Sequence, residues 1–112
     1  MKIPLDSRQM QKSYLLFGDI DGKIDQATFR RKVEEHLKKN GGGLCEIYTT
    51  RNGFHFKMRT RAPVHILDRA AFLCKVGTDP LFVARLLETG TQTLFSTRRG
   101  TPNETFLTSI TV

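Results

Sequence analysis

Two carboxylates stand one residue apart at the end of an apolar run, at Asp19 and Asp21. Residues two apart on a strand point to the same side, so this pair offers hard oxygen ligands of the kind that Mg²⁺ or Mn²⁺ prefers. Further along, His55, Lys57 and Arg59 alternate with apolar residues and offer donors to a phosphate. Together the two sets predict a metal- and phosphate-binding site formed by Asp19, Asp21 and His55.

The overall charge favours an anionic partner. Lys and Arg number 18 against 11 Asp and Glu, a formal net charge of +7, which is typical of proteins that bind nucleic acid or nucleotide. Arg51 lies in the turn before His55, and Arg98 with Arg99 follows a later apolar run. We expect these arginines to extend the binding surface, although a solvated turn explains Arg98 and Arg99 equally well.

The acids need an element that presents them. The apolar run 14–21 is short and closed by a glycine, which predicts a central strand. Alternation places Leu15 and Phe17 on the same side as the acids. Burying two carboxylates beneath helices costs several kcal/mol per ion. We therefore expect Asp19 and Asp21 on the sheet face that helices leave open.

Three helices are expected around this strand. The first runs from 26 to 39, because Asp25 suits its N-cap and apolar residues recur at every fourth position. The second spans 67–76. The third is short and begins after Thr78 or Asp79, with a proline in its first turn.

A hairpin is expected to carry the basic set. The strands 45–50 and 54–59 flank an Asn-Gly pair at 52–53, the strongest short signal for a two-residue turn. That turn pairs Thr50 with His55 and places the basic residues of the second strand on the polar face.

The remaining strands, at 93–97 and 105–112, complete the order β-α-β-β-α(α)-β-β. This order predicts an α+β fold, a ferredoxin-like or RRM-like β-α-β-β-α-β sandwich with an extra C-terminal strand and one open sheet face. Its first and third strands are expected to be central neighbours. The length predicts a single domain over 1–112, with 1–12 as a loose lead-in.

Cellular context follows from what the sequence lacks. Cys45 and Cys74 have no metal-site spacing, so we expect buried free thiols in a reducing compartment. No signal peptide and no membrane span of about 20 apolar residues is evident. The sequence therefore predicts a cytoplasmic protein with no membrane partner.

Two other interpretations of the motifs are weaker. The sequence from Asp19 to Asp25 resembles the middle of an EF-hand loop, but Phe17 and Thr28 would occupy its first and twelfth ligand positions. Base stacking on the sheet usually needs two or three aromatic side chains. Phe54 and Phe56 have the wrong parity for the open face, and Tyr48 is the one aromatic that the pattern of its own strand places there.

The motifs resemble a known family. An apolar strand ending in Asp-x-Asp at 15–21, then a helix, then a hairpin with Gly-Phe-His at 53–55, resembles the catalytic core of archaeo-eukaryotic primases, which are primase-polymerases. The stretches 76–85 and 94–98 are similar to small primase-like proteins of archaeal plasmids and viruses. The resemblance spans roughly residues 14–98.

The resemblance implies a role in replication of a mobile element. It implies that Asp19 and Asp21 bind Mg²⁺ or Mn²⁺, and that His55 contacts the phosphates of a nucleoside triphosphate. Single-stranded DNA is the further expected partner. The resemblance implies that an active member would be a metal-dependent nucleotidyltransferase with Asp19, Asp21 and His55 as its catalytic residues, whose metals stabilise the pyrophosphate leaving group.

One departure leaves the activity open. Active members place a third carboxylate on a later strand, where 94–97 carries hydroxyls. Glu46 and Glu104 are the remaining candidates. A catalytically degenerate member that binds nucleotide or DNA is therefore an equal expectation.

Three alternatives stay open beside the primase-like hypothesis. The first is a non-catalytic basic nucleic-acid-binding module, which would bind with steep salt dependence and without metal. The second is a rolling-circle-type nuclease, which needs paired histidines and a tyrosine on a helix, whereas Tyr14 and Tyr48 fall in predicted strands. The third is a small dimerising interaction domain.

Overall fold

The computed structural model describes residues 12–90, 92, 97–98, 101–102 and 104–112. The expected lead-in falls outside these residues except for Lys12, which begins the first strand. In chain order the elements are β1 (Lys12–Asp21), α2 (Gln26–Lys39), β2 (Gly43–Thr49), β3 (Gly53–His65), α3 (Ile66–Lys75), α4 (Pro80–Thr89), β4 (Thr97–Arg98), β5 (Thr101–Pro102) and β6 (Thr105–Thr111).

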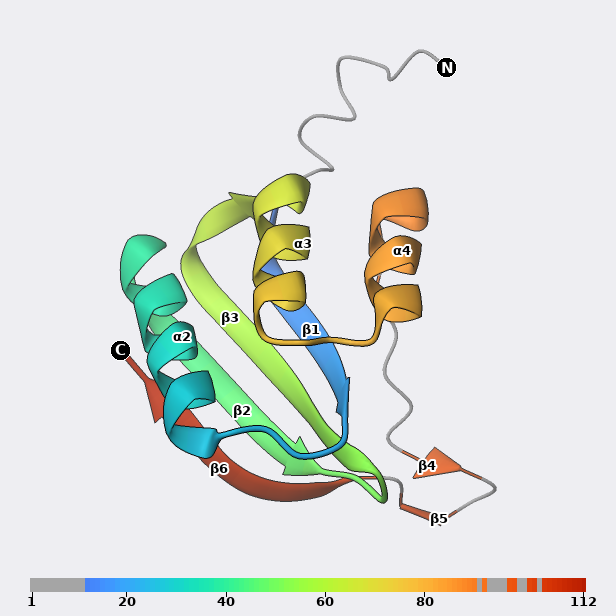
Figure 1. The fold of residues 1–112 in the computed structure, drawn as a ribbon. Coiled ribbons are helices and arrows are strands. Elements are labelled where there is room, and N and C mark those ends of the chain that lie inside the picture. The colour runs from blue at the N-terminus through green and yellow to red at the C-terminus, as the bar shows by residue number, and fades with distance from the viewer. Residues whose placement is uncertain (1–11, 91, 93–96, 99–100, 103) are drawn as a thin grey trace.

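The fold is α+β, built on a four-stranded antiparallel sheet in the order β1-β3-β2-β6. The helices α2, α3 and α4 lie on one side of this sheet (Figure 1). The other side is called the open face below. The short strands β4 and β5 pair with each other in a separate ribbon.

The strand order corrects one expectation. β1 and β3 are neighbours, as expected, but among the described strands β1 lies at the edge of the sheet and β3 and β2 occupy its centre. β6 pairs with the edge of β2 that is opposite β3. This confirms the C-terminal strand expected at 105–112. The strand expected at 93–97 falls mostly outside the described residues, and only Thr97 is seen in a strand.

β1 divides its side chains between the two faces as the alternation predicts. Leu16 and Ile20 are buried toward the helices, while Asp19 is half-buried and Asp21 is exposed on the open face. Gly18 shares the buried side, because a Cβ there would lie 1.9 Å from the ring of Phe56. The aromatic ring of β3 thus fills the space that a side chain on β1 would need.

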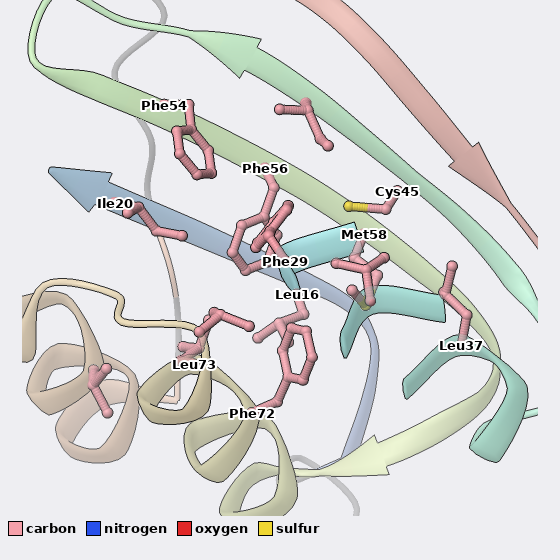
Figure 2. Close-up of a cluster of buried hydrophobic side chains, with 14 of the residues drawn as sticks. Leu16, Ile20, Phe29, Leu37, Cys45, Phe54, Phe56, Met58, Phe72 and Leu73 are labelled. Carbon is pink, nitrogen blue, oxygen red and sulfur yellow. The ribbon is translucent and has the colours of Figure 1, made fainter. Parts of the chain in front are cut away.

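The core lies between the sheet and the helices (Figure 2). α2 begins and ends where the sequence predicts. The side chain of Asp25 accepts a hydrogen bond from the backbone of Thr28, and the apolar stripe of the helix is fully buried. α3 and α4 pack on the same side, with α4 capped by Asp79. The buried core residues labelled in the figure are Leu16, Ile20, Phe29, Leu37, Cys45, Phe54, Phe56, Met58, Phe72 and Leu73.

The hairpin register differs from the expected one by two residues. Tyr48, and not Thr50, pairs with His55, and the backbone N–H of Thr50 donates to the carbonyl of Gly53. A shift of two keeps every side chain on its predicted face. The physical reason is that Gly53 belongs to β3 and pairs with Asp21 on β1, where a Cβ would lie 1.9 Å from the carbonyl oxygen of Ile20. Glycine is therefore needed at position 53 because β1 and β3 approach closely there, and not because of the turn.

The outer edge of β1 is covered at its middle by a side chain. The backbone N–H of Phe17 donates to Oε1 of Gln92 at 2.8 Å, and Nε2 of Gln92 donates to the carbonyl of Phe17 at 2.6 Å. The amide of Gln92 therefore forms the two hydrogen bonds that a further strand would form there.

Replacing Gln92 with alanine should lower the free energy of unfolding by about 1–2 kcal/mol, since each lost hydrogen bond contributes about 1 kcal/mol. Amide exchange at Phe17 should become faster. Urea unfolding and hydrogen exchange measure both effects, with the exposed Gln26→Ala as the control. Unchanged exchange at Phe17 would contradict this description of the edge.

The cysteines follow expectation only in part. Both are free, and Cys45 is buried, which raises the pKa of its thiol to about 12 through loss of hydration. Cys74 is exposed at the end of α3, so its expected burial is wrong. None of the helices in the described part of the chain is long and apolar enough to cross a bilayer.

Candidate functional site

The strand register aligns the candidate residues across the sheet. Asp19 on β1 is directly opposite His55 on β3, His55 is opposite Tyr48 on β2, and Tyr48 is opposite Phe106 on β6. Paired residues share a face, so these four form one row on the open face. The neighbouring row toward the middle of β1 includes Lys57. The acids and the basic set therefore share one face, as the sequence predicts.

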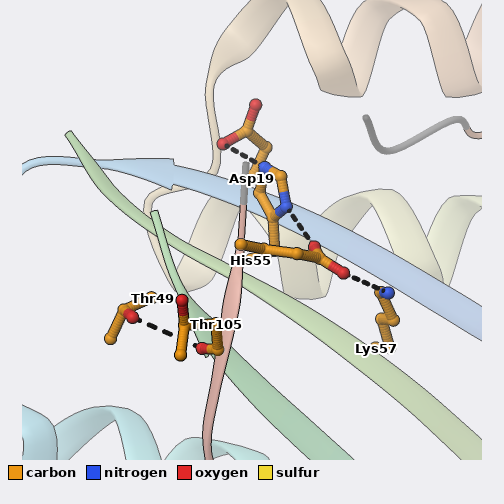
Figure 3. Close-up of polar contacts among 6 residues, drawn as sticks. Asp19, Thr49, His55, Lys57 and Thr105 are labelled. Atoms are coloured by element: carbon orange, nitrogen blue, oxygen red, sulfur yellow. Dashed lines mark hydrogen bonds and ion pairs between the residues drawn. The ribbon is translucent and has the colours of Figure 1, made fainter. Parts of the chain in front are cut away.

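Asp19, His55 and Lys57 form a continuous chain of contacts together with Glu104 (Figure 3). Nε2 of His55 lies 3.5 Å from Oδ1 of Asp19. Nδ1 of His55 lies 2.7 Å from Oε2 of Glu104, and Nζ of Lys57 donates to Oε1 of Glu104 at 2.6 Å. We call Asp19, His55, Glu104 and Lys57 the His55 network. Each ring nitrogen of His55 therefore has a carboxylate oxygen within 3.5 Å.

Burial in the His55 network is uneven. The side chains of His55 and Glu104 are each only 6% exposed, whereas those of Asp19 and Lys57 are 33% and 30% exposed. His55 was expected to be open to a ligand, and it is instead enclosed on the open face. The accessible ends of the network are thus the carboxylate of Asp19 and the ammonium of Lys57.

Asp19 lies in an acidic environment. Its pKa is raised above the ordinary 3.8, first by partial burial and then by the carboxylates of Asp21 and Asp79, although His55 acts in the opposite direction. Asp79 is held close because its backbone N–H donates to the carbonyl of Asp19 at 3.0 Å. Three carboxylates therefore gather at the end of β1, and a cation bound there would relieve their repulsion.

Glu104 is a candidate carboxylate whose position next to His55 the sequence did not predict. Burial acts to raise its pKa, but hydrogen bonds and charge from Lys57 and His55 outweigh burial, so the pKa lies below the ordinary 4.5. It stands one residue before β6, in a segment with no helical or strand periodicity. Its position next to His55 comes from the path of the chain and not from a motif.

The aromatic content of the open face is larger than expected. Phe106 is 54% exposed, and its ring meets that of Tyr48 edge-on at 5.6 Å between centroids. Nζ of Lys57 lies 4.4 Å from the centroid of Tyr48. Phe17 lies on the same face, one row along β1. The expectation of a single aromatic on this face is therefore wrong.

Of the remaining candidate arginines, Arg51 and Arg59 do not join the His55 network. Arg59 is exposed on the open face, two rows from His55 on the same strand, and Arg51 is exposed in the turn between β2 and β3. Arg98 lies in β4, but its side chain is outside the described part of the chain. Arg99 also lies outside it.

A divalent metal fits this site only at its accessible end, where Asp19 and Asp21 lie. Among the described residues, no group of three His, Cys, Asp or Glu side chains has metal-site geometry. Asp19 and Asp21 are on one face and accessible, and carboxylate oxygens suit Mg²⁺ or Mn²⁺. Both oxygens of Glu104 are engaged by Lys57 and His55. Asp19 and Asp21 are therefore the residues that would hold the metal.

Comparison with known proteins adds no relative. No family model, no curated protein and no solved structure matches this chain. The primase-like relationship therefore stays a prediction from the sequence motifs.

Proposed function

We propose that this domain binds a nucleotide together with a divalent metal at the β1 end of its open face. The observation that carries the proposal is the register of β1 against β3, which puts Asp19 opposite His55 with 3.5 Å between their nearest atoms. A carboxylate pair and the ammonium of Lys57 on the same accessible face suit a metal-bound polyphosphate.

Each residue has a distinct part in this proposal. Asp19 and Asp21 hold the Mg²⁺ or Mn²⁺, which neutralises charge on the phosphates. Lys57 is partly exposed and donates to a phosphate oxygen in place of Glu104. His55 stays enclosed beneath the phosphates, and its two ring nitrogens, which contact Asp19 and Glu104, hold the carboxylate of Asp19 in position.

We further propose that the domain is primase-like and has a ferredoxin-like core. The order β1-β3-β2 agrees with the first three strands of that fold, and β6 would be the extra C-terminal strand. In the primase family that the motifs resemble, nucleotidyl transfer needs a third carboxylate from a later strand, whereas Asp79, the third acid near the pair, caps α4. Glu104 is the nearest such group to His55, but its two oxygens are engaged by His55 and Lys57. We therefore propose nucleotide binding, with transfer dependent on release of Glu104.

The test is calorimetric titration of MnCl₂ with ATP into the wild type and Asp19→Asn/Asp21→Asn. The double variant should lose the metal-dependent part of binding, at least tenfold in affinity, because removing a charged ligand costs more than about 1.4 kcal/mol. Glu34→Gln/Glu35→Gln on α2 removes the same charge elsewhere and is the control. Equal binding by wild type and the β1 variant would reject the site.

A metal-independent single-strand-binding module is the second candidate. The exposed ring of Phe106 beside Tyr48 favours it, because aromatic platforms bind unpaired bases. This candidate predicts binding of a dT oligonucleotide in EDTA, weakened by salt. Loss of all oligonucleotide binding in EDTA would exclude it.

A further inference from the structure

The row that contains the acid–imidazole pair continues into the aromatic pair. From Asp19 the row passes through His55 to Tyr48 and then Phe106. Adjacent strands are about 4.8 Å apart, so Tyr48 lies about 10 Å from Asp19 across two such steps. That separation matches the reach of a nucleotide from its phosphates to its base.

The exposed ring of Phe106 is placed by a local irregularity. Between Ile47 and Tyr48 the register of β2 against β6 shifts, so that Leu107 is skipped and Phe106 comes opposite Tyr48. Bulges re-aim side chains in this way. Without the shift, Leu107 would occupy the position beside Tyr48.

Tyr48 is held from two sides. Phe106 meets it edge-on at 75° between ring planes, and Lys57 lies over the ring at 4.4 Å. Lys57 also contacts Glu104, so one lysine connects the aromatic pair with the His55 network. Phe106 keeps about half of its surface in solvent. A fixed ring next to an exposed one offers a flat base an apolar surface at little entropic cost.

We propose that Tyr48 and Phe106 form a nucleobase-stacking subsite for the nucleotide whose phosphates lie over Asp19 and His55. The inference rests on the proposed function for the place of the phosphates, but the stacking itself does not. The base belongs either to a free nucleoside triphosphate or to a nucleotide within a single strand. The chemistry is the same in both cases, because any base presents a π-face.

The test compares ligands with and without a base. In Mn²⁺, the wild type should bind ATP about tenfold more tightly than inorganic tripolyphosphate, since one stacked base contributes roughly that factor. Phe106→Leu should remove this difference and leave tripolyphosphate affinity unchanged. Leu107→Ala, at the neighbouring exposed position, should keep it. A parallel titration with a dT oligonucleotide shows whether the base comes from a single strand.

The outcomes separate the two proposals. Equal affinity for ATP and tripolyphosphate in the wild type, or a difference that survives both Phe106→Leu and Tyr48→Leu, overturns the stacking subsite. Failure of tripolyphosphate to bind, with Phe106-dependent binding of the oligonucleotide, supports the subsite and rejects the metal–phosphate site. Sedimentation of each variant shows whether the rings instead join two copies of the chain, and loss of a dimer in Phe106→Leu would also overturn the inference.

Discussion

Substituting alanine for Gly53 is expected to lower the free energy of unfolding by about 3 kcal/mol, the upper range for overpacking. The added Cβ would lie 1.9 Å from the carbonyl oxygen of Ile20 and 3.0 Å from Cα of Asp21. These are backbone atoms of β1, so relief requires the two strands to separate. Urea unfolding measures the loss, and amide exchange along β1 should accelerate with it.

Gly77→Ala is the matched control for Gly53→Ala. Gly77 has a φ of +83° with nothing within 4 Å of the added Cβ, so its substitution costs only backbone strain, about 1 kcal/mol. If both variants lost the same stability, close approach between β1 and β3 would not explain Gly53. The register of the candidate site would then need another basis.

Removing Glu104 is the second change with a large expected effect. Glu104→Ala leaves the enclosed His55 and Lys57 without the carboxylate that both of them contact. It should lower the free energy of unfolding by about 3 kcal/mol, as for other broken buried pairs. The exposed pair of Arg30 with Glu34, 3.7 Å apart, provides the control. Glu34→Ala should change stability by less than about 0.5 kcal/mol.

The effect of Glu104 depends on pH in a stated direction. Its pKa in the fold lies below the ordinary 4.5, so its stabilisation is complete above that value and is lost as pH falls through the lowered pKa. The stability difference between wild type and Glu104→Ala should be constant near neutral pH and shrink in acid. A difference that grew below pH 4.5, the ordinary value, would contradict the contacts of Glu104 with His55 and Lys57.

Local patterns were enough to predict the helices and the faces of the strands. Asp25 and the four-residue apolar period placed α2 at its observed bounds. Alternation, together with the cost of burying carboxylates beneath helices, put Asp19 and His55 on the same face. Both predictions rest on residues that are close together in the sequence, and hydrophobic periodicity is informative over that range.

Features that depend on distant segments could not be predicted. The Asn-Gly pair indicated a turn, but packing of Gly53 against β1 moved the register by two residues. Glu104 reaches His55 across the sheet from a segment without periodicity. Phe106 faces Tyr48 only because β6 has a bulge at Leu107. None of these three contacts is encoded within one element.

Paramagnetic line broadening by Mn²⁺ in the amide spectrum, recorded with and without ATP, tests most directly whether Asp19 and Asp21 hold a metal at the end of β1. Broadening should centre on Asp19, Asp21 and the facing strand at His55, and adding ATP should confine it more closely to this region. Broadening centred on the acids of α2, such as Glu34 and Glu35, with the end of β1 unaffected, would contradict this metal site.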